Sequence, residues 1–129
     1  MKVAVRVRPF NQREISQGLD KLCVAMDGKT NTTTLYKDSE KKDDHSKHDH
    51  KYTFDFSYWS HDSFTAGLDG VTRPEGPNSN YADQERMYAD IGRPLLASAM
   101  EGFNCSVFAY GQTGSGKSTT LAAMIGQIN

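Results

Sequence analysis

Short apolar runs alternate with longer polar stretches along this chain, which predicts a β-sheet joined by surface loops. Residues 3–7 place valines on one face at period two and predict a strand that ends at Pro9, since proline cannot donate to a strand ladder. Residues 22–26 and 32–36 are apolar or β-branched and flank an Asp-Gly dipeptide, so they predict the two strands of a hairpin. Residues 52–56 alternate aromatic side chains and predict a further strand.

The clearest helical pattern spans residues 83–101, where apolar side chains recur every four positions. Asp83 suits the N-cap, and Gly102 suits the residue that follows the last turn. Pro94 lies inside this pattern and removes a backbone hydrogen bond at a cost of ~3 kcal/mol, so we expect the helix to bend or break. The aromatic residues that precede the helix are expected to pack in the core rather than bind a ligand: Tyr58, Trp59 and Phe64.

Three polar stretches separate these elements. Residues 11–20 predict a surface turn or short helix, and residues 65–80, with several glycines and prolines, predict a long irregular loop. Residues 37–51 contain no apolar side chain, so we expect a mobile charged loop that cannot offset its own ordering entropy. Its histidines and aspartates are compatible with weak binding of a divalent transition metal, but a solvated loop is the favoured interpretation.

Composition narrows the class of protein. A chain of 129 residues suits one domain, and a net charge of −1 gives no basic surface for nucleic acid or a membrane. No apolar run approaches the ~18 residues that a membrane-spanning helix needs. The two cysteines, Cys23 and Cys105, match no metal or redox spacing, which suggests reduced thiols in the cytoplasm.

The strongest chemical signal is the motif G-x-x-x-x-G-K-S at residues 111–118. Residues 105–110 before it predict a buried strand, and a helix is predicted to begin at Lys117. Glycines allow successive backbone N–H groups to point into one concavity, which suits the oxygens of a triphosphate. The lysine can reach the β- and γ-phosphates, and the Ser118 hydroxyl can coordinate Mg²⁺. The predicted phosphate site comprises Gly111, Gln112, Thr113, Gly114, Ser115, Gly116, Lys117 and Ser118.

Residues 108–118 strongly resemble the phosphate loop of the kinesin motor domain. Residues 101–104 resemble the E-G-Y/F-N that precedes it in kinesins, and residues 5–11 resemble the kinesin R-x-R-P strand end. Residues 58–61 and 90–92 further resemble the kinesin-3 group. The resemblance extends from about residue 2 to about residue 118.

This resemblance implies an α/β fold of the P-loop NTPase type. A central, mostly parallel sheet with helices on both faces is expected, together with a small N-terminal antiparallel sheet. Residues 1–129 would form the N-terminal portion of a motor domain, which would bind ATP with Mg²⁺. By the same resemblance, Arg6 and Pro9 would lie beside the adenine and ribose, while Arg8 is assigned no contact. Thr119 is also assigned to the nucleotide site by this resemblance, at a position near the base where kinesins usually carry His or Tyr, so the chain departs from the family there.

The resemblance also implies a function in which the full domain couples ATP hydrolysis to movement along microtubules. Tubulin would be the partner, a stalk outside this chain could form a dimer, and the protein would be cytoplasmic and associated with the cytoskeleton. The two switch segments that complete kinesin catalysis are not predicted here, so no catalytic residue is assigned and this chain alone is expected to be inactive.

Two alternatives stay open from the sequence. A short non-motor product could bind nucleotide or tubulin without turnover. A different P-loop enzyme, such as a small nucleotide kinase, is disfavoured because those proteins usually place the loop near the N-terminus, whereas here it begins at Gly111 behind several predicted strands.

Overall fold

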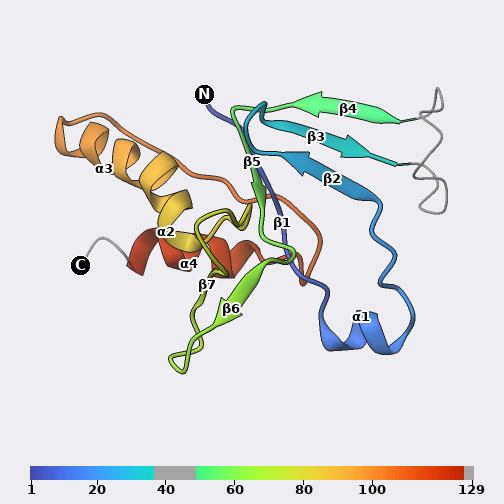
Figure 1. Ribbon diagram of the computed structural model, residues 1–129. Helices are drawn as coiled ribbons and strands as arrows, with labels where there is room; N and C mark the ends of the chain where they lie inside the picture. The colour runs from blue at the N-terminus through green and yellow to red at the C-terminus, as the bar shows by residue number, and fades with distance from the viewer. Residues whose placement is uncertain (37–48, 127–129) are drawn as a thin grey trace.

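The computed structural model describes residues 1–36 and 49–126. In chain order its elements are β1 (Ala4–Val7), α1 (Gln12–Ser16), β2 (Val24–Asp27), β3 (Thr32–Leu35), β4 (His50–Thr53), β5 (Phe56–Trp59), β6 (Phe64–Ala66), β7 (Thr72–Pro74), α2 (Gln84–Met87), a π-helical turn η1 (Tyr88–Gly92), α3 (Arg93–Met100) and α4 (Lys117–Gly126). Figure 1 shows β1 and β5 at the centre, with the longer helices on one side and the three-stranded sheet on the other.

The centre of the fold is the parallel pair β1–β5, in which Arg6 lies opposite Tyr58. The ladder continues past both strand ends, because the amide of Asp55 donates to Val3 at 3.0 Å and the amide of Ser60 donates to Val7 at 3.0 Å. Within the described residues, this pair is all that is formed of the expected central parallel sheet.

The predicted hairpin at residues 22–36 is confirmed as β2–β3, and β4 adds to it in an antiparallel order β2-β3-β4. Asp27 shapes the turn, since its Oδ1 accepts the amide of Lys29 at 2.8 Å. His50 and Lys51 pair with β3, so the predicted charged loop at residues 37–51 is too long at its C-terminal end. The rest of that loop, residues 37–48, lies outside the described residues.

The prediction of one strand over residues 52–56 is wrong. The chain leaves one sheet after Thr53 and enters another at Phe56. At the crossing, the amide of Phe54 still donates to Asn31, while the amide of Phe56 donates to Val3. Alternation identifies the extended conformation, but it does not identify the strand that will accept each hydrogen bond. As a result Tyr52 stays exposed, whereas Phe56 packs against the core.

The prediction of an irregular loop over residues 65–80 is also wrong in part. It contains the antiparallel pair β6–β7, in which Thr65 lies opposite Arg73. Asp69 stabilises the connection, because it accepts the amide of Val71 at 3.1 Å and pairs with Arg73 at 2.7 Å. Strands of three residues are too short to show an alternation of apolar and polar residues, so the glycines and prolines of this segment indicated a loop instead.

The helix predicted over residues 83–101 is confirmed, with the expected irregularity near Pro94. Asp83 caps it by accepting the amide of Arg86 at 2.8 Å. Ahead of the proline the helix widens into η1, where the amide of Arg93 reaches back to Tyr88. The wider turn accommodates a residue that has no N–H, so the irregularity takes this form. Gly102 closes the helix at φ 93°, and the amide of Phe103 donates to Ser98 at 3.1 Å.

The core lies where β5 meets these helices. Tyr58, Ala82 and Met87 are buried, and Phe56, Ile91 and Met124 pack around them. The Tyr58 hydroxyl donates to Asp90 at 3.0 Å, and burial together with this bond raises the pKa of the tyrosine. The prediction that Tyr58 packs in the core is therefore confirmed. Within the described part of the chain, no helix is long and apolar enough to cross a membrane.

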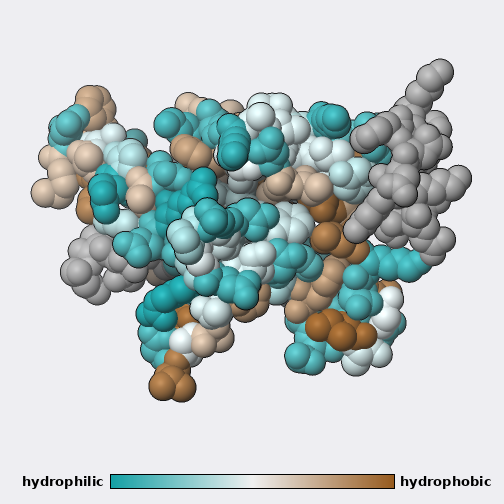
Figure 2. Space-filling model, viewed as in Figure 1, coloured by the Kyte–Doolittle hydropathy of each residue, from teal (hydrophilic) through white to brown (hydrophobic). Residues whose placement is uncertain are grey.

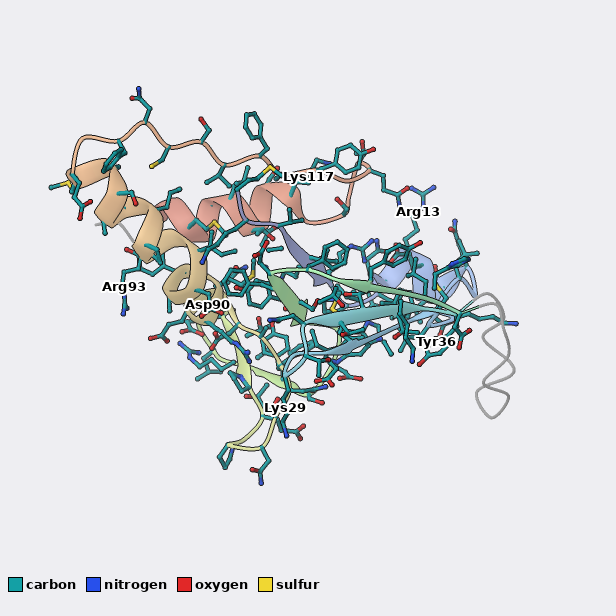
Figure 3. The ribbon with its side chains drawn as sticks, turned by 90° about the horizontal axis from the view of Figure 1, so that it is seen from above. Arg13, Lys29, Tyr36, Asp90, Arg93 and Lys117 are labelled. Carbon is teal, nitrogen blue, oxygen red and sulfur yellow. The ribbon has the colours of Figure 1, made fainter. Side chains whose placement is uncertain are left out.

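Residues 105–110, predicted as a buried strand, are not in a strand. Phe108 is 91% exposed and Tyr110 is 103% exposed. No other described segment forms a ladder with them, and an extended backbone without a partner cannot bury its N–H and C=O groups. Figure 3 shows the segment at the outer edge of the molecule, with side chains directed away from the ribbon.

Candidate nucleotide site

The phosphate motif forms a tight turn that leads directly into α4. Gly114 and Gly116 adopt φ values of 81° and 93°, which a side chain would strain, so the glycines serve the role predicted for them. The amide of Ser115 closes the turn by donating to Gln112 at 3.1 Å. Within the described residues, the amides of Thr113, Gly114 and Gly116 have no acceptor. The turn therefore offers several free N–H donors at the N-terminus of a helix, which is a favourable place for an anion.

Lys117 begins α4, where Figure 3 labels it, and its side chain folds back to the carbonyls of Gly111 and Gln112. Its ammonium group donates to the carbonyl of Gly111 at 2.7 Å and to that of Gln112 at 2.8 Å. The lysine thus lies against the loop and holds two of its carbonyls. A phosphate oxygen would compete with these carbonyls for the same donors.

Three serine and threonine hydroxyls complete the candidate site. Ser118 and Thr119 are exposed in the first turn of α4. The Oγ of Ser115 is buried and has no hydrogen-bond partner in the described structure. A buried hydroxyl without a partner is costly, so this atom fits a loop that is completed by a ligand or by a rearrangement. With Lys117 and the free amides, these hydroxyls form a donor and ligand set that fits a triphosphate and Mg²⁺.

Arg6 connects β1 to the helices around the site. Its guanidinium donates to Ser60 at 2.9 Å, to Gln84 at 3.1 Å and to Thr120 at 3.1 Å. Burial lowers the pKa of Arg6, and Tyr81 and Asp83 oppose that shift. Arg6 therefore lies beside Thr120 in the first turn of α4, but its donors already contact protein atoms. Pro9, the other residue expected near the base, is half-buried and accepts a hydrogen bond from Arg8 at 2.6 Å.

Arg8, to which the sequence assigned no contact, reaches the phosphate loop. Its Nε donates to the carbonyl of Gly114 at 2.9 Å, while its two terminal nitrogens bind the carboxylate of Glu14 at 2.9 and 2.7 Å. The bond from Arg8, followed by the amide of Asn11, lowers the pKa of Glu14 to about 2. A carboxylate six residues after an arginine gives no pattern that would have revealed this link to residue 114.

The histidines of the charged loop, for which weak metal binding was the less favoured interpretation, form no metal site within residues 1–36 and 49–126. His50 lies in β4, while His45 and His48 fall outside the described residues. Among the described side chains, no group of three or more His, Cys, Asp or Glu residues could hold a metal ion.

The loop has the sequence and the turn of a phosphate-binding loop that leads into a helix, and similarity to known proteins identifies the family. The family model of the kinesin motor domain matches residues 6–127, so this chain belongs to the kinesin motor domain family. The chain is 44% identical over 121 residues to rat "Kinesin-like protein KIF28", and the match covers 94% of this chain and 11% of that protein. It is 46% identical over 121 residues to human KIF1C, with 94% of this chain and 9% of KIF1C covered. Similarity to KIF1C and to rat KIF1A confirms the resemblance to the kinesin-3 group.

Solved structures confirm the fold class. A KIF14 structure, described as a dimer with AMP-PNP in complex with a microtubule, matches with a TM-score of 0.70 and 34% identity, covering 95% of this chain and 28% of that one. A second KIF14 structure, described with ADP in complex with a microtubule, matches with a TM-score of 0.64 and 35% identity, covering 92% and 27%. The chain thus spans about a tenth of the curated relatives named above and little more than a quarter of these solved chains.

Proposed function

We propose that this chain supplies the ATP-binding part of a kinesin motor, in which residues 1–129 form the N-terminal portion of the motor domain. The observation that carries the proposal is the loop at residues 111–118, which combines free backbone amides, the Lys117 ammonium group and an unpaired buried serine hydroxyl. The whole protein would couple ATP hydrolysis to movement along microtubules.

Each loop residue has a distinct part in this proposal. The free amides of Thr113, Gly114 and Gly116 and the Lys117 ammonium group would bind the phosphates, and the Ser118 hydroxyl would coordinate Mg²⁺. Mg²⁺ bound to ATP neutralises charge on the phosphate oxygens. Arg6 and Pro9 would lie on the side of the base, together with Thr119. No catalytic residue is assigned, because no residue of this chain has a sequence pattern for positioning the attacking water.

The proposed partners follow from the relatives. Both KIF14 structures are described as microtubule complexes, and one as a dimer, so tubulin is the proposed track. A stalk outside these residues would form any dimer. The protein would then act in the cytoplasm, on the microtubule cytoskeleton, with no nucleic acid and no membrane contact from this segment.

A second candidate is a product that binds nucleotide or tubulin without turnover. It is favoured by one observation: within the described residues, the groups that contact the loop are arginine, lysine and backbone atoms, and no carboxylate binds it directly. Steady-state ATPase measurements on the whole protein, with and without microtubules, separate the two, because only the motor would turn over ATP. For residues 1–129 alone both candidates make the same prediction. We expect no turnover at a motor's rate.

The nucleotide site is tested by equilibrium binding of Mg-ATP to the wild-type chain and to Lys117→Ala. We expect the variant to lose affinity by about tenfold to a hundredfold, the size of a hydrogen bond to a charged group. Lys29→Ala is the matched control, because Lys29 is an exposed lysine in the turn after β2. Ser118→Ala should weaken the Mg²⁺ dependence of binding more than binding itself. Equal affinities in wild type and Lys117→Ala would overturn the proposal.

A further inference from the structure

We propose that Arg8 is a positioning residue for the phosphate loop, which it holds in its binding shape before any nucleotide arrives. Its effect on the free loop is independent of the proposed function, while its effect on affinity rests on it. Arg8 is 106 residues away from Gly114 in sequence, so this contact joins the first strand to the nucleotide site.

The guanidinium of Arg8 is fixed by several bonds at once. Nε donates to Gly114, Nη1 donates to both Pro9 and Glu14, and Nη2 donates to Glu14 at 2.7 Å. Because the guanidinium is planar and rigid, the bidentate bond to Glu14 also sets the direction of Nε. The aliphatic part of Arg8 lies over the same loop, since a Cβ added to Gly116 would be 3.9 Å from Arg8 Cδ.

Glu14 is itself held in place, so Arg8 rests on a fixed support. Asn11 and Glu14 form a capping box at the start of α1: the amide of Glu14 donates to the Asn11 side chain, and the amide of Asn11 donates to the Glu14 carboxylate, both at 2.8 Å. The backbone of Arg8 is tied as well, because its carbonyl lies 3.2 Å from Nδ1 of His61. The capping box of α1 therefore also serves as a support for the phosphate loop.

The contact sets the orientation of one peptide group in the loop. In a planar trans peptide, the carbonyl of Gly114 and the N–H of Ser115 point in opposite directions. Arg8 holds the carbonyl at 2.9 Å, and the N–H closes the turn by donating to Gln112 at 3.1 Å. A carbonyl that is bound to Arg8 cannot turn toward the phosphates, where its partial negative charge would repel them. Arg8 thus favours the arrangement in which the loop presents donors.

A second ion pair in the chain provides a matched control. Arg73 also binds a carboxylate, that of Asp69, through two nitrogens, at 3.2 and 2.7 Å. That pair joins residues four apart in the connection between β6 and β7, and both side chains are about half exposed. Arg73→Gln therefore removes an arginine–carboxylate pair of the same kind without any contact to the phosphate loop.

The test measures hydrogen exchange in residues 1–129 without nucleotide, for wild type, Arg8→Gln, Arg8→Lys and Arg73→Gln. We expect the Ser115 amide to exchange about tenfold faster in Arg8→Gln, the order of one charge-assisted hydrogen bond. In Arg8→Lys the exchange rate of the Ser115 amide should lie between those of wild type and Arg8→Gln, because a lysine keeps the charge but cannot bind Glu14 and Gly114 at the same time. Arg73→Gln should match wild type. The amide of Ser60, which donates to Val7 beside Arg8, should not change in any variant.

Three results would overturn the proposal. Equal acceleration of the Ser60 and Ser115 amides would mean that Arg8 merely stabilises the β1–β5 pair. An unchanged exchange rate of the Ser115 amide in Arg8→Gln would mean that the contact between Arg8 and Gly114 does not hold the loop in shape. If the Ser115 amide of the wild-type chain is not protected from exchange, the loop is not held in shape either.

Mg-ATP binding then separates this inference from the proposed function. Arg8→Gln should lower affinity by about tenfold, for the same physical reason. If Lys117→Ala binds as well as wild type, the proposed function fails, and the exchange of the free loop still decides the role of Arg8.

Discussion

Two apolar segments of this chain have similar composition and opposite outcomes. β5 is a buried strand, with Tyr58 2% exposed, whereas residues 105–110 form no strand and leave Phe108 91% exposed. β5 has β1 along its edge and Ala82, Met87 and Met124 against its face. Residues 105–110 have neither within the described structure. The comparison teaches that an apolar run shows what a segment is able to bury, while its partners decide whether it does.

The exposed apolar residues on the surface also show that residues 105–110 lack a partner in the described part of the chain. Apolar atoms on the face shown in Figure 2 are scattered, for example over α1 and at the tip of the β6–β7 pair. Ile15 lies in α1, Leu19 follows α1 and Leu68 lies between β6 and β7, and their side chains are 48%, 63% and 112% exposed. Single exposed apolar residues are common on proteins. The consecutive run from Val107 to Tyr110 is different, because it lies next to the phosphate motif and is apolar over several residues.

The largest effect is expected from removing the ring at the centre of β5. Tyr58→Ala should lower the free energy of unfolding by about 3–5 kcal/mol, because it leaves a cavity beside Met87 and breaks the bond to Asp90. Phe108→Ala should change it by less than about 0.5 kcal/mol. Urea unfolding measures both. Similar losses in the two variants would show that residues 105–110 are packed after all.

A smaller effect is expected at the helix that covers β5. Asp83→Ala should cost about 1 kcal/mol, because the amide of Arg86 loses its capping acceptor. Asp83→Asn is the matched variant, and it should retain most of the stability since its side chain still accepts. Thermal unfolding measures the difference. If Asp83→Asn loses as much stability as Asp83→Ala, the effect comes from the charge of Asp83 rather than from the capping hydrogen bond.

The effect of pH should be smaller still. The pKa of Glu14 lies at about 2 in the folded chain, against an ordinary value of 4.5, so its contribution to stability is fully present above pH 4.5. That contribution is lost as the pH falls from 4.5 to about 2, because protonation breaks the bond to Arg8. Glu14→Gln should lack this part of the pH dependence. Identical pH profiles in wild type and variant would contradict the assignment.

The smallest effect on stability, but a clear effect on association, is expected from Phe108→Ser. An exposed apolar run beside an unpaired backbone favours self-association. Sedimentation should therefore show less self-association in the variant, at an unchanged free energy of unfolding. Tyr52→Ser is a control, because Tyr52 is 47% exposed but lies in the paired strand β4. Equal changes in the two variants would mean that exposure alone, rather than the missing partner, drives association.

The features that the sequence predicted correctly are set by neighbouring residues, and those that it missed are set by distant partners. Local signals were sufficient for the hairpin at Asp27, the cap at Asp83, the C-terminal glycine at position 102 and the turn of the phosphate loop, because neighbouring residues determine each of them. The switch of sheets near Phe54, the short strands β6 and β7, and the exposure of residues 105–110 depend on distant partners. The bond from Arg8 to Gly114 is missed for that reason too, since it joins the two ends of the described chain.

Hydrogen exchange with and without Mg-ATP tests the central claim most directly. The account predicts that Mg-ATP slows exchange of the amides at residues 112–118 severalfold or more, while the amides at residues 104–110 continue to exchange at the unprotected rate. The first group would gain phosphate oxygens as acceptors, and the second would still lack a strand partner. Unchanged exchange at residues 112–118 under saturating Mg-ATP would contradict the account.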